Sequence, residues 1–291
     1  MNDADPKFNL RHWLQNLVLR SLIGLALLLP YRLRVPFFGG LMRRVIAPLI
    51  GYRARSLDNL AFIWPDLALS RRQNIAQNVS DNVGRTVIEN YSSKDFMARM
   101  AKAVPIGPGM AALTAAAEKG QAAILVTGHF GNYEAARASL VARGFAVGGL
   151  YRAARNSYFN QHYVRTMEAF GGPVFAQGRR GTAGFVRHLR SGGQLVLLFD
   201  QDVRRAPAID FLGKPARTAT SAAELALRYN ALLIPFYATR QQDGLSFEIY
   251  LEAPIPAAEA TTMTAVLSDS LAARVRANPD QWFWIHRRWK K

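Results

Sequence analysis

The stretch AAILVTGHFGNYE, residues 122–134, decides the fold. Its apolar, β-branched run over residues 124–127 is typical of a buried strand. The run ends at Gly128, His129 follows directly, and helix-forming residues begin a few positions later. Open α/β sheets build their functional sites where buried strands end. We therefore expect His129 to belong to such a site.

A carboxylate, Glu134, follows His129 by five positions. Within one helix that spacing would point the two side chains well apart, but the intervening loop contains Gly131 and lets the chain fold back. A carboxylate on one imidazole nitrogen fixes the tautomer and leaves the other nitrogen free as a base. The spacing therefore predicts a His129–Glu134 dyad that takes a proton from a hydroxyl group. In the alternative interpretation, His129 only ends the strand and Glu134 stabilises the helix N-terminus by its charge.

The composition favours an anionic partner. The chain has 291 residues, half of them hydrophobic, and a formal net charge of +17. A basic excess of that size indicates binding to nucleic acid, an anionic membrane or an acidic protein. The absence of cysteine excludes a zinc finger, a disulfide framework and a thiol nucleophile, and no RNP-type aromatic motif is found. We therefore expect a membrane and an acidic carrier as partners, and no nucleic acid. A non-catalytic basic membrane- or RNA-binding protein is the alternative.

The first 34 residues are predicted to be a membrane-anchoring helix. Residues 9–29 have helical composition, with polar side chains on one face of the first half and a wholly apolar run over residues 22–29. That run is much shorter than the roughly 20 residues that span a bilayer, and no small-residue cleavage site follows it. A helix lying in the interface fits best; a signal peptide, a single span and a buried core helix are the alternatives. Nine basic residues against two acidic ones in residues 1–55 predict that the rest of the chain stays on the cytoplasmic side.

Strand and helix patterns alternate after a PIGPG turn cluster at residues 105–109. This alternation predicts an α/β fold with a mostly parallel sheet flanked by helices over residues 105–291. Residues 35–104 are predicted to be a helical segment, with one helix from Ser70 to about Glu89. The last strand alternates polar and apolar residues, as edge strands do. The expected strands cover residues 124–127, 146–151, 174–176, 195–199, 232–237 and 246–251, and the expected helices cover residues 132–142, 158–170, 182–190, 219–229 and 262–277.

The words HFGNYE and TGHFGNYE carry a family resemblance. The first resembles the H-x4-D/E motif of the glycerolipid acyltransferase superfamily, and the second is similar to its form in the lipid A secondary (late) acyltransferases. Other similar blocks run from about Arg55 to Lys290. The resemblance implies an inner-membrane enzyme on the cytoplasmic face. It would move a fatty acyl chain from an acyl carrier protein or acyl-CoA thioester to a hydroxyl of a lipid A precursor. It further implies that His129 is the base, that Glu134 orients it, and that no cofactor is needed. A lysophospholipid or aminolipid O-acyltransferase is the alternative enzyme.

An arginine at the end of the second core strand is the first candidate for substrate binding. Arg152 closes the sequence GGLYR and would lie beside His129; guanidinium groups are suited to phosphate and carboxylate. It resembles the superfamily's second block, whose arginine binds the acceptor phosphate. Arg155 and Asn156 follow closely and are predicted to share that role. Without the resemblance, Arg152 is equally well a surface residue of a loop.

Four more residues are predicted to contact substrate. Arg179 and Arg180, in GRRG, open a helix where backbone amides and guanidinium groups can hold an anion, although the Walker ending is lacking. Asp200, in LVLLFDQD, resembles the DQ form of the lipid A acyltransferases and is predicted to orient an arginine. A metal pair with Asp202 is the alternative, and we expect no metal. Phe211, in FLGKPART, matches an FxGxxAxT-like stretch of the family and is predicted to line an acyl channel.

The C-terminal sequence NPDQWFWIHRRWKK, residues 278–291, places three tryptophans among basic residues. Such a composition suits a membrane–water interface, and nucleic-acid stacking platforms use the same residue types. The stretch also strongly resembles the C-terminal signature of the lipid A acyltransferases.

Overall fold

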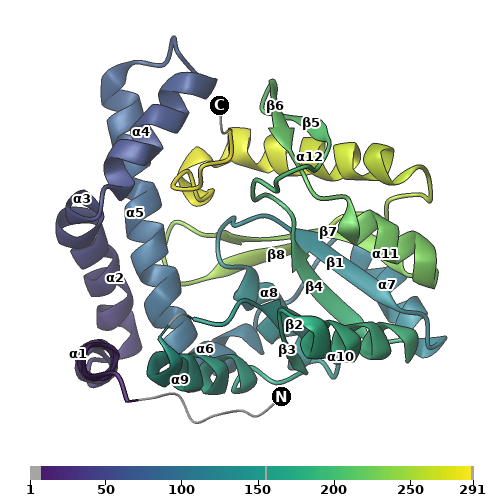
Figure 1. Cartoon of the computed structure of the whole chain (residues 1–291), viewed down its shortest axis with the longest axis horizontal. Coiled ribbons are helices and arrows are strands. Elements are labelled where there is room, and N and C mark those ends of the chain that lie inside the picture. Colours follow the sequence, from purple (N-terminus) through teal and green to yellow (C-terminus); the bar gives the residue numbers. More distant parts are fainter. Residues whose placement is uncertain (1–7, 155, 290–291) are drawn as a thin grey trace.

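A six-stranded sheet forms the centre of the protein (Figure 1). The structure, a computed structural model, describes residues 8–154 and 156–289. The strands are β1 (Ala123–Thr127), β2 (Val147–Tyr151), β3 (Val174–Ala176), β4 (Gln194–Leu198), β7 (Leu232–Arg240) and β8 (Phe247–Leu251). They lie in the order β3-β2-β4-β1-β7-β8, and all neighbours are parallel except β7 and β8. The predicted mostly parallel sheet and its edge strand are confirmed.

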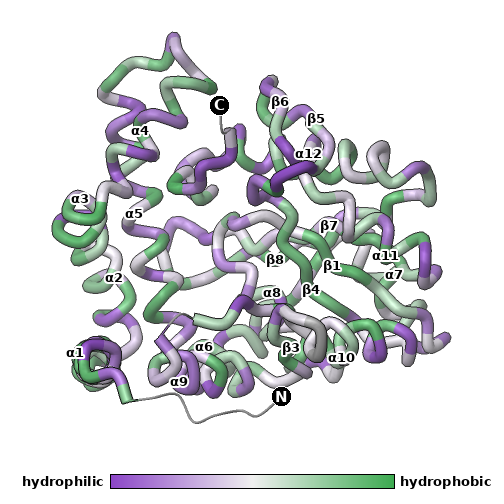
Figure 2. Tube along the Cα trace, viewed as in Figure 1, coloured by the Kyte–Doolittle hydropathy of each residue, from purple (hydrophilic) through white to green (hydrophobic). Residues whose placement is uncertain are grey.

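Helices cover both faces of this sheet because β1 is buried on both sides. Ile124 and Val126 belong to one apolar cluster, and Ala123 and Leu125 belong to the other, as the alternation of side chains along a strand requires. The first cluster includes apolar side chains of α10 (Arg179–Arg190), α11 (Ser221–Tyr229) and α12 (Ala260–Ala277), and the second includes those of α6 (Ser93–Met100), α7 (Pro108–Glu118) and α8 (Tyr133–Val141). Figure 2 shows the central strands as hydrophobic along their length.

Residues 8–91 form a helical layer beside the sheet, on the left of Figure 1. It contains α1 (Leu10–Leu27), α2 (Tyr31–Leu41), a π-helix η1 (Met42–Ile46), α3 (Ala47–Leu49), α4 (Tyr52–Ile63) and α5 (Leu69–Tyr91). The predicted helices over residues 9–29 and 70–89 correspond to α1 and α5. Over residues 8–154 and 156–289, no helix combines the length and the apolar character needed to cross a bilayer.

Three features were not predicted. One is helix α7, which lies where the sequence analysis expected no helix. A hairpin of β5 (Ala208–Phe211) and β6 (Lys214–Arg217) follows the sheet's fourth strand, with its turn at Leu212 and Gly213, both at positive φ. The chain after α12 passes through η2 (Pro279–Gln281) and folds back over the sheet, where Trp282 and Trp284 are fully buried. This burial corrects the expectation that the C-terminal tryptophans lie at a membrane interface, because two of the three pack into the core instead.

Candidate active site

The site begins where two neighbouring parallel strands end. His129 follows β1, and Asp200 follows β4, which pairs with β1 along its whole length. The imidazole Nδ1 of His129 lies 2.7 Å from Asp200 Oδ1, and the backbone N–H of His129 donates to Asp200 Oδ2, also at 2.7 Å. The carboxylate therefore forms hydrogen bonds with both the ring and the main chain of the histidine.

Asp200 is enclosed by its partners. Its side chain is 1% exposed, and the indole Nε1 of Trp282 donates to Oδ2 at 2.8 Å. Burial alone would raise the pKa of this carboxyl, but the charge of His129 and its hydrogen bonds hold that pKa well below its usual range. Asp200 is thus an ionised acceptor that fixes the proton of His129 on Nδ1 and leaves Nε2 as the basic nitrogen.

The other side of His129 faces an open cavity and a second histidine. Its side chain is 24% exposed, and the amide nitrogen of Gln201 lies 3.5 Å from Nε2. The ring centroid of His286 lies 4.4 Å away, nearly perpendicular, and the N–H of Phe283 donates to the His129 carbonyl. The C-terminal segment thus contacts both the ring and the main chain of His129, while Nε2 remains accessible.

Glu134 does not take the predicted place beside the imidazole. Its carboxylate accepts from Arg137 Nε at 2.8 Å, and both side chains are buried, at 7% and 1% exposure. The guanidinium of Arg137 continues to the carbonyls of Met167 and Gly171. No hydrogen bond joins Glu134 to His129 in the described part of the chain. The correction has a geometric reason: Glu134 lies in the first turn of α8, whereas the aspartate of the neighbouring strand reaches Nδ1 directly.

Glycine is required twice in the loop that carries His129. A Cβ at position 128 would lie 2.8 Å from Asp200 Oδ2, and one at position 131, where φ is +55°, would meet the Ala238 carbonyl oxygen at 1.9 Å. Such distances are not tolerated between non-bonded atoms. The two glycines therefore allow the loop to lie against both the carboxylate and β7.

A buried ion pair supports the end of the same loop. The side chain of Asn132 caps α8 by accepting from the Glu134 N–H, and it donates to Glu89 Oε2 at 3.0 Å. Glu89, on α5, is fully buried and pairs with Arg240 of β7. The helical layer and the sheet are thereby joined directly behind the histidine loop.

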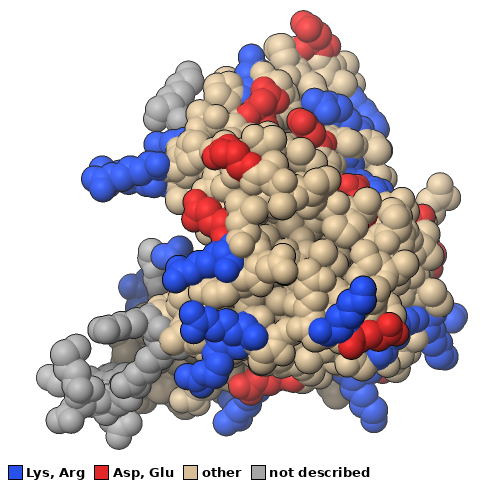
Figure 3. Space-filling model, turned by 90° about the vertical axis from the view of Figure 1, so that its right-hand side faces the viewer, with Lys and Arg blue, Asp and Glu red and all other residues tan. Residues whose placement is uncertain are grey.

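His129 opens into a cavity of about 400 Å³ at the carboxyl edge of the sheet, here named the catalytic cavity. Arg152, Gln201, Glu134 and Arg137 also line it. The predicted proximity of Arg152 to His129 is therefore found, and Arg152 is exposed and able to meet an anionic ligand. In Figure 3 the outline of the molecule is indented at its left edge, and basic side chains project on both sides of the indentation.

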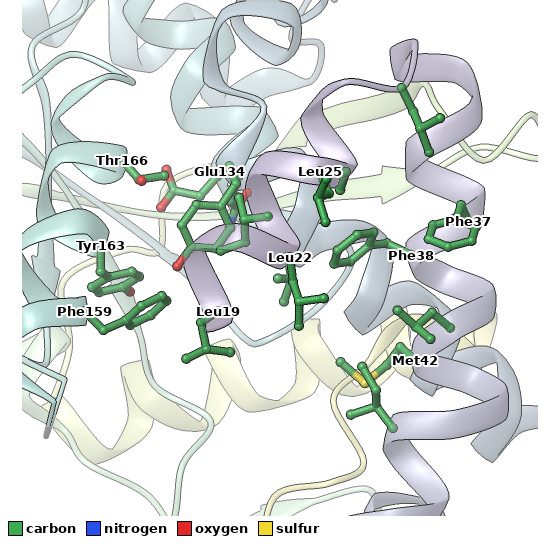
Figure 4. A pocket seen from close by; sticks show the side chains of 18 of the residues that line it. Leu19, Leu22, Leu25, Phe37, Phe38, Met42, Glu134, Phe159, Tyr163 and Thr166 are labelled. Carbon is green, nitrogen blue, oxygen red and sulfur yellow. The ribbon is translucent and has the colours of Figure 1, made fainter. Parts of the chain in front are cut away.

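A second, larger cavity adjoins the first and is almost entirely apolar. This apolar cavity, of about 830 Å³, lies between α1, α2, α5 and α9 (Ser157–Glu168). Figure 4 shows Leu19, Leu22 and Leu25 of α1 between aromatic side chains of α9 on one side and those of α2 on the other. Tyr133, Glu134, Tyr163 and Met167 line both cavities. An apolar chain can therefore extend from the catalytic cavity into the helical layer.

The remaining predicted residues are placed as follows. Asn156 caps α9 and donates to the His12 carbonyl at 2.7 Å, so it ties α1 to α9. Phe211 is buried against the rings of Trp282 and Trp289, which corrects its predicted place in an acyl channel. Arg155 lies outside the described residues. Arg179 and Arg180 form the start of α10. The structure describes their main chain and not their side chains.

The predicted role of Asp200 in orienting an arginine differs from its geometry, since in the described part of the chain its side chain accepts hydrogen bonds from His129 and Trp282. Asp202 pairs with Arg217. Across residues 8–154 and 156–289, no group of three or more His, Cys, Asp or Glu side chains could hold a metal ion. Sequence reasoning missed Gln201 and Trp282. Trp282 stands 82 positions from its partner, and nothing local to either residue indicates the contact.

The site combines a mostly parallel sheet, an ionised Asp–His pair at its carboxyl edge and adjoining lipid-sized cavities, an arrangement suited to general base catalysis on a hydroxyl. The whole-chain comparison agrees. Residues 4–291 match the model of the bacterial lipid A biosynthesis acyltransferase family, and the chain belongs to that family. This match confirms the resemblance that the sequence motifs carry.

Characterised relatives include two kinds of acyltransferase. The lipid A biosynthesis lauroyltransferase of Escherichia coli strain K12 is 23% identical, over 98% of this chain and 95% of its own length. The phosphatidylinositol mannoside acyltransferase of Mycobacterium tuberculosis is 25% identical over 62% of this chain, and that of Mycolicibacterium smegmatis is 24% identical over 61%. The chain spans 58% and 60%, respectively, of the length of these two mycobacterial relatives.

Proposed function

We propose that this enzyme transfers a fatty acyl chain from an acyl carrier protein or CoA thioester to a hydroxyl of a lipid A precursor. The observation that carries the proposal is the pair of His129 and Asp200, whose geometry leaves Nε2 free beside the catalytic cavity. The relative whose name specifies lipid A biosynthesis is matched over nearly its whole length. That coverage favours a lipid A precursor over a phosphatidylinositol mannoside.

The reaction is a direct transfer. His129 Nε2 takes the proton of the acceptor hydroxyl as its oxygen attacks the thioester carbonyl carbon. The tetrahedral intermediate then expels the thiolate, which receives the proton from the imidazolium, so that an ester and a free thiol result. Asp200 stabilises the transient imidazolium. The amide of Gln201, close to Nε2, is suited to donate a hydrogen bond to an oxygen of the reacting groups.

The two cavities accommodate different parts of the substrates. The exposed Arg152 lines the catalytic cavity, which suits the phosphorylated head of an acceptor. The apolar cavity provides a site for the fatty acyl chain, because transferring such a chain from water to an apolar lining is favourable.

A membrane location, on the cytoplasmic face of the inner membrane, belongs to the same proposal. Leucines of α1 and of its C-cap position remain exposed, among them Leu10 at 58%, Leu17 at 47% and Leu28 at 80%. Arg11, Arg20 and Arg32 are exposed on the same segment. Exposed apolar side chains mixed with cations are typical of segments that lie on anionic lipid.

The test is transfer by the purified protein. Wild type, His129→Ala and Asp200→Asn are incubated with an acyl carrier protein thioester and a lipid A precursor, and the products are identified by mass spectrometry. We expect one added acyl ester with wild type and none above background with His129→Ala. Turnover by His129→Ala close to that of wild type would contradict the mechanism. Transfer only to phosphatidylinositol mannosides or lysophospholipids would contradict the proposed acceptor.

A further inference from the structure

A third cavity reaches His129 from the side of the helical layer. This α5 slot has a volume of about 210 Å³. Val83, Thr86 and Asn90 of α5 line one wall, and His129, Tyr133 and residues 280–283 line the other. Tyr133 lines the catalytic cavity, the apolar cavity and the α5 slot alike. Three cavities of different chemistry therefore meet beside the basic histidine.

The reacting carbon of the proposed transfer also has three branches. In the tetrahedral intermediate it carries, besides the oxyanion, the fatty acyl chain, the oxygen of the acceptor and the sulfur of the donor. The proposed function assigns the acyl chain to the apolar cavity and the acceptor to the arginine-lined catalytic cavity. The sulfur and the arm attached to it then require a third path that leads away from His129, and the α5 slot provides one.

The lining of the α5 slot does not suit either of the other branches. Within the described residues it includes no Lys or Arg, and Asp280 is its only carboxylate, so a phosphorylated head would be repelled there. Asparagine, threonine and glutamine side chains interrupt its apolar surface, so it is less suited than the apolar cavity to a bare hydrocarbon chain.

The same lining does suit a neutral chain that alternates methylene and amide groups. Val79, Val83 and Val87 give it an apolar wall, and Asn90 stands on that wall as well. Val87 and Asn90 also border the apolar cavity, which is why the two donors compared below carry the same acyl chain. The carbonyl oxygen of Asn90 accepts a long hydrogen bond from Asn132 at 3.4 Å. Its amide nitrogen has no hydrogen-bond partner in the described part of the chain and is available to a ligand carbonyl.

We propose that the α5 slot binds the pantetheine arm of the thioester donor. This arm is common to acyl carrier protein and CoA, so the site would serve either donor. The inference rests on the proposed function, since it assumes a thioester substrate. It assigns Val83 and Asn90 to donor binding.

The experiment compares two donors that differ only in the arm. One is the pantetheine thioester of a fatty acid, and the other is the ethanethiol thioester of the same acid. Transfer to one acceptor is measured for wild type, Val83→Phe, which fills the slot, and Asn90→Leu, which removes the free amide at similar size. Val266→Phe, an exposed position on α12, is the matched control.

We expect Val83→Phe to lower kcat/KM for the pantetheine thioester by about tenfold or more, and Asn90→Leu by about threefold, through KM rather than kcat. The ethanethiol thioester should be used equally well by wild type and both variants. Val266→Phe should change neither donor.

Equal effects of Val83→Phe on the two donors, or a rise only in the acceptor KM, would overturn the assignment. If Val83→Phe has a lowered melting temperature, the same comparison of the two donors with Asn90→Leu decides whether the slot binds the arm. Wild type that transfers neither from these two thioesters nor from an acyl carrier protein thioester refutes the proposed function itself. Wild type that transfers from both while the variants fail to distinguish them refutes only the slot.

Discussion

The imidazole Nδ1 of His129 and the carboxylate Oδ1 of Asp200 lie 2.7 Å apart at the ends of two adjacent parallel strands. A second hydrogen bond, from the His129 main chain to Asp200 Oδ2, prevents the carboxylate from turning away. The indole N–H of Trp282 donates a hydrogen bond to the same oxygen, Oδ2. The orientation of the base is therefore fixed before any substrate binds.

This pairing predicts that Asp200, not Glu134, controls the histidine. Asp200→Asn keeps the shape of the side chain but removes the charge that stabilises the imidazolium, so kcat should fall by about a thousandfold. Glu134→Gln retains an oxygen that can accept from Arg137, and kcat should fall by less than about tenfold. Steady-state rates for the two purified variants check the prediction. A larger loss with Glu134→Gln than with Asp200→Asn would restore the dyad expected from the sequence.

The strands that carry the site were predictable from the sequence, because they depend on local patterns. The buried run of β1 followed by Gly128 and His129 marks the strand end, and each predicted core strand lies within three residues of an observed one at both ends. Arg152 was expected beside His129 for the same reason: parallel strands present their carboxyl ends at one edge.

The partners within the site were not predictable. Two carboxylates follow strands near His129, and sequence spacing favoured Glu134, which is nearer in the chain. The choice depends on strand order: β4, not β2, lies beside β1 and delivers Asp200. The buried positions of Trp282 and Phe211 likewise depend on how the C-terminal segment folds back, which no local pattern indicates.

His286 should make the folded state sensitive to acid. Burial is the main cause that lowers its pKa to about 4; the charge of His129 acts in the same direction, Asp200 opposes it, and Arg288 adds to the lowering. A group whose pKa is depressed by folding contributes stability above its unfolded pKa, near 6.5, and loses it as the pH falls toward the folded value. Between pH 7.5 and pH 4.5, wild type should therefore lose about 2–3 kcal/mol more unfolding free energy than His286→Phe. Urea unfolding of both proteins at the two pH values measures this difference, and equal losses would show that His286 is not buried in its neutral form.

The apolar cavity should limit the length of the transferred chain. Met42 lies at the side of the cavity away from Glu134 (Figure 4). Met42→Trp would shorten the available space, so kcat/KM should fall by about tenfold for the longest accepted acyl chain and little for chains several carbons shorter. When a long-chain and a short-chain donor compete in one reaction, the masses of the products give the ratio of the two kcat/KM values directly. An unchanged ratio would place the acyl chain elsewhere.

The outer side of α1 should bind lipid. Leu17 and Leu28 are exposed and line none of the cavities described above, so glutamine at both positions removes apolar surface without altering the substrate sites. We expect Leu17→Gln/Leu28→Gln to bind anionic vesicles at least about tenfold more weakly. Leu227→Gln/Val266→Gln, at exposed positions on other helices, is the control. Sedimentation with vesicles measures both, and equal binding of the two double variants would argue against an α1 anchor.

Basic side chains near the carboxyl edge of the sheet should steer an acidic carrier to the site. Arg204 and Arg205 are exposed in the loop that follows Asp200, and Arg179 and Arg180 begin α10. Acyl carrier proteins are acidic, and charge attraction of this kind speeds encounter but is screened by salt. Arg204→Glu should therefore raise KM for an acyl carrier protein thioester by about threefold or more at low ionic strength, and the double reversal at Arg179 and Arg180 should do the same.

The discriminating measurement is the salt dependence of kcat/KM for three donors. Lys119→Glu is the matched control, since Lys119 precedes β1 and so lies at the opposite edge of the sheet, yet the substitution changes the net charge equally. The defect of Arg204→Glu should disappear above about 0.5 M salt, where the Debye length is only a few ångströms. CoA is itself anionic and should show a shallower slope, and a pantetheine thioester should show almost none. Equal slopes for the carrier and pantetheine donors would exclude steering by this surface. The assignment of His129 and Asp200 would stand in either case, because their chemistry requires only the acceptor hydroxyl and the thioester carbonyl.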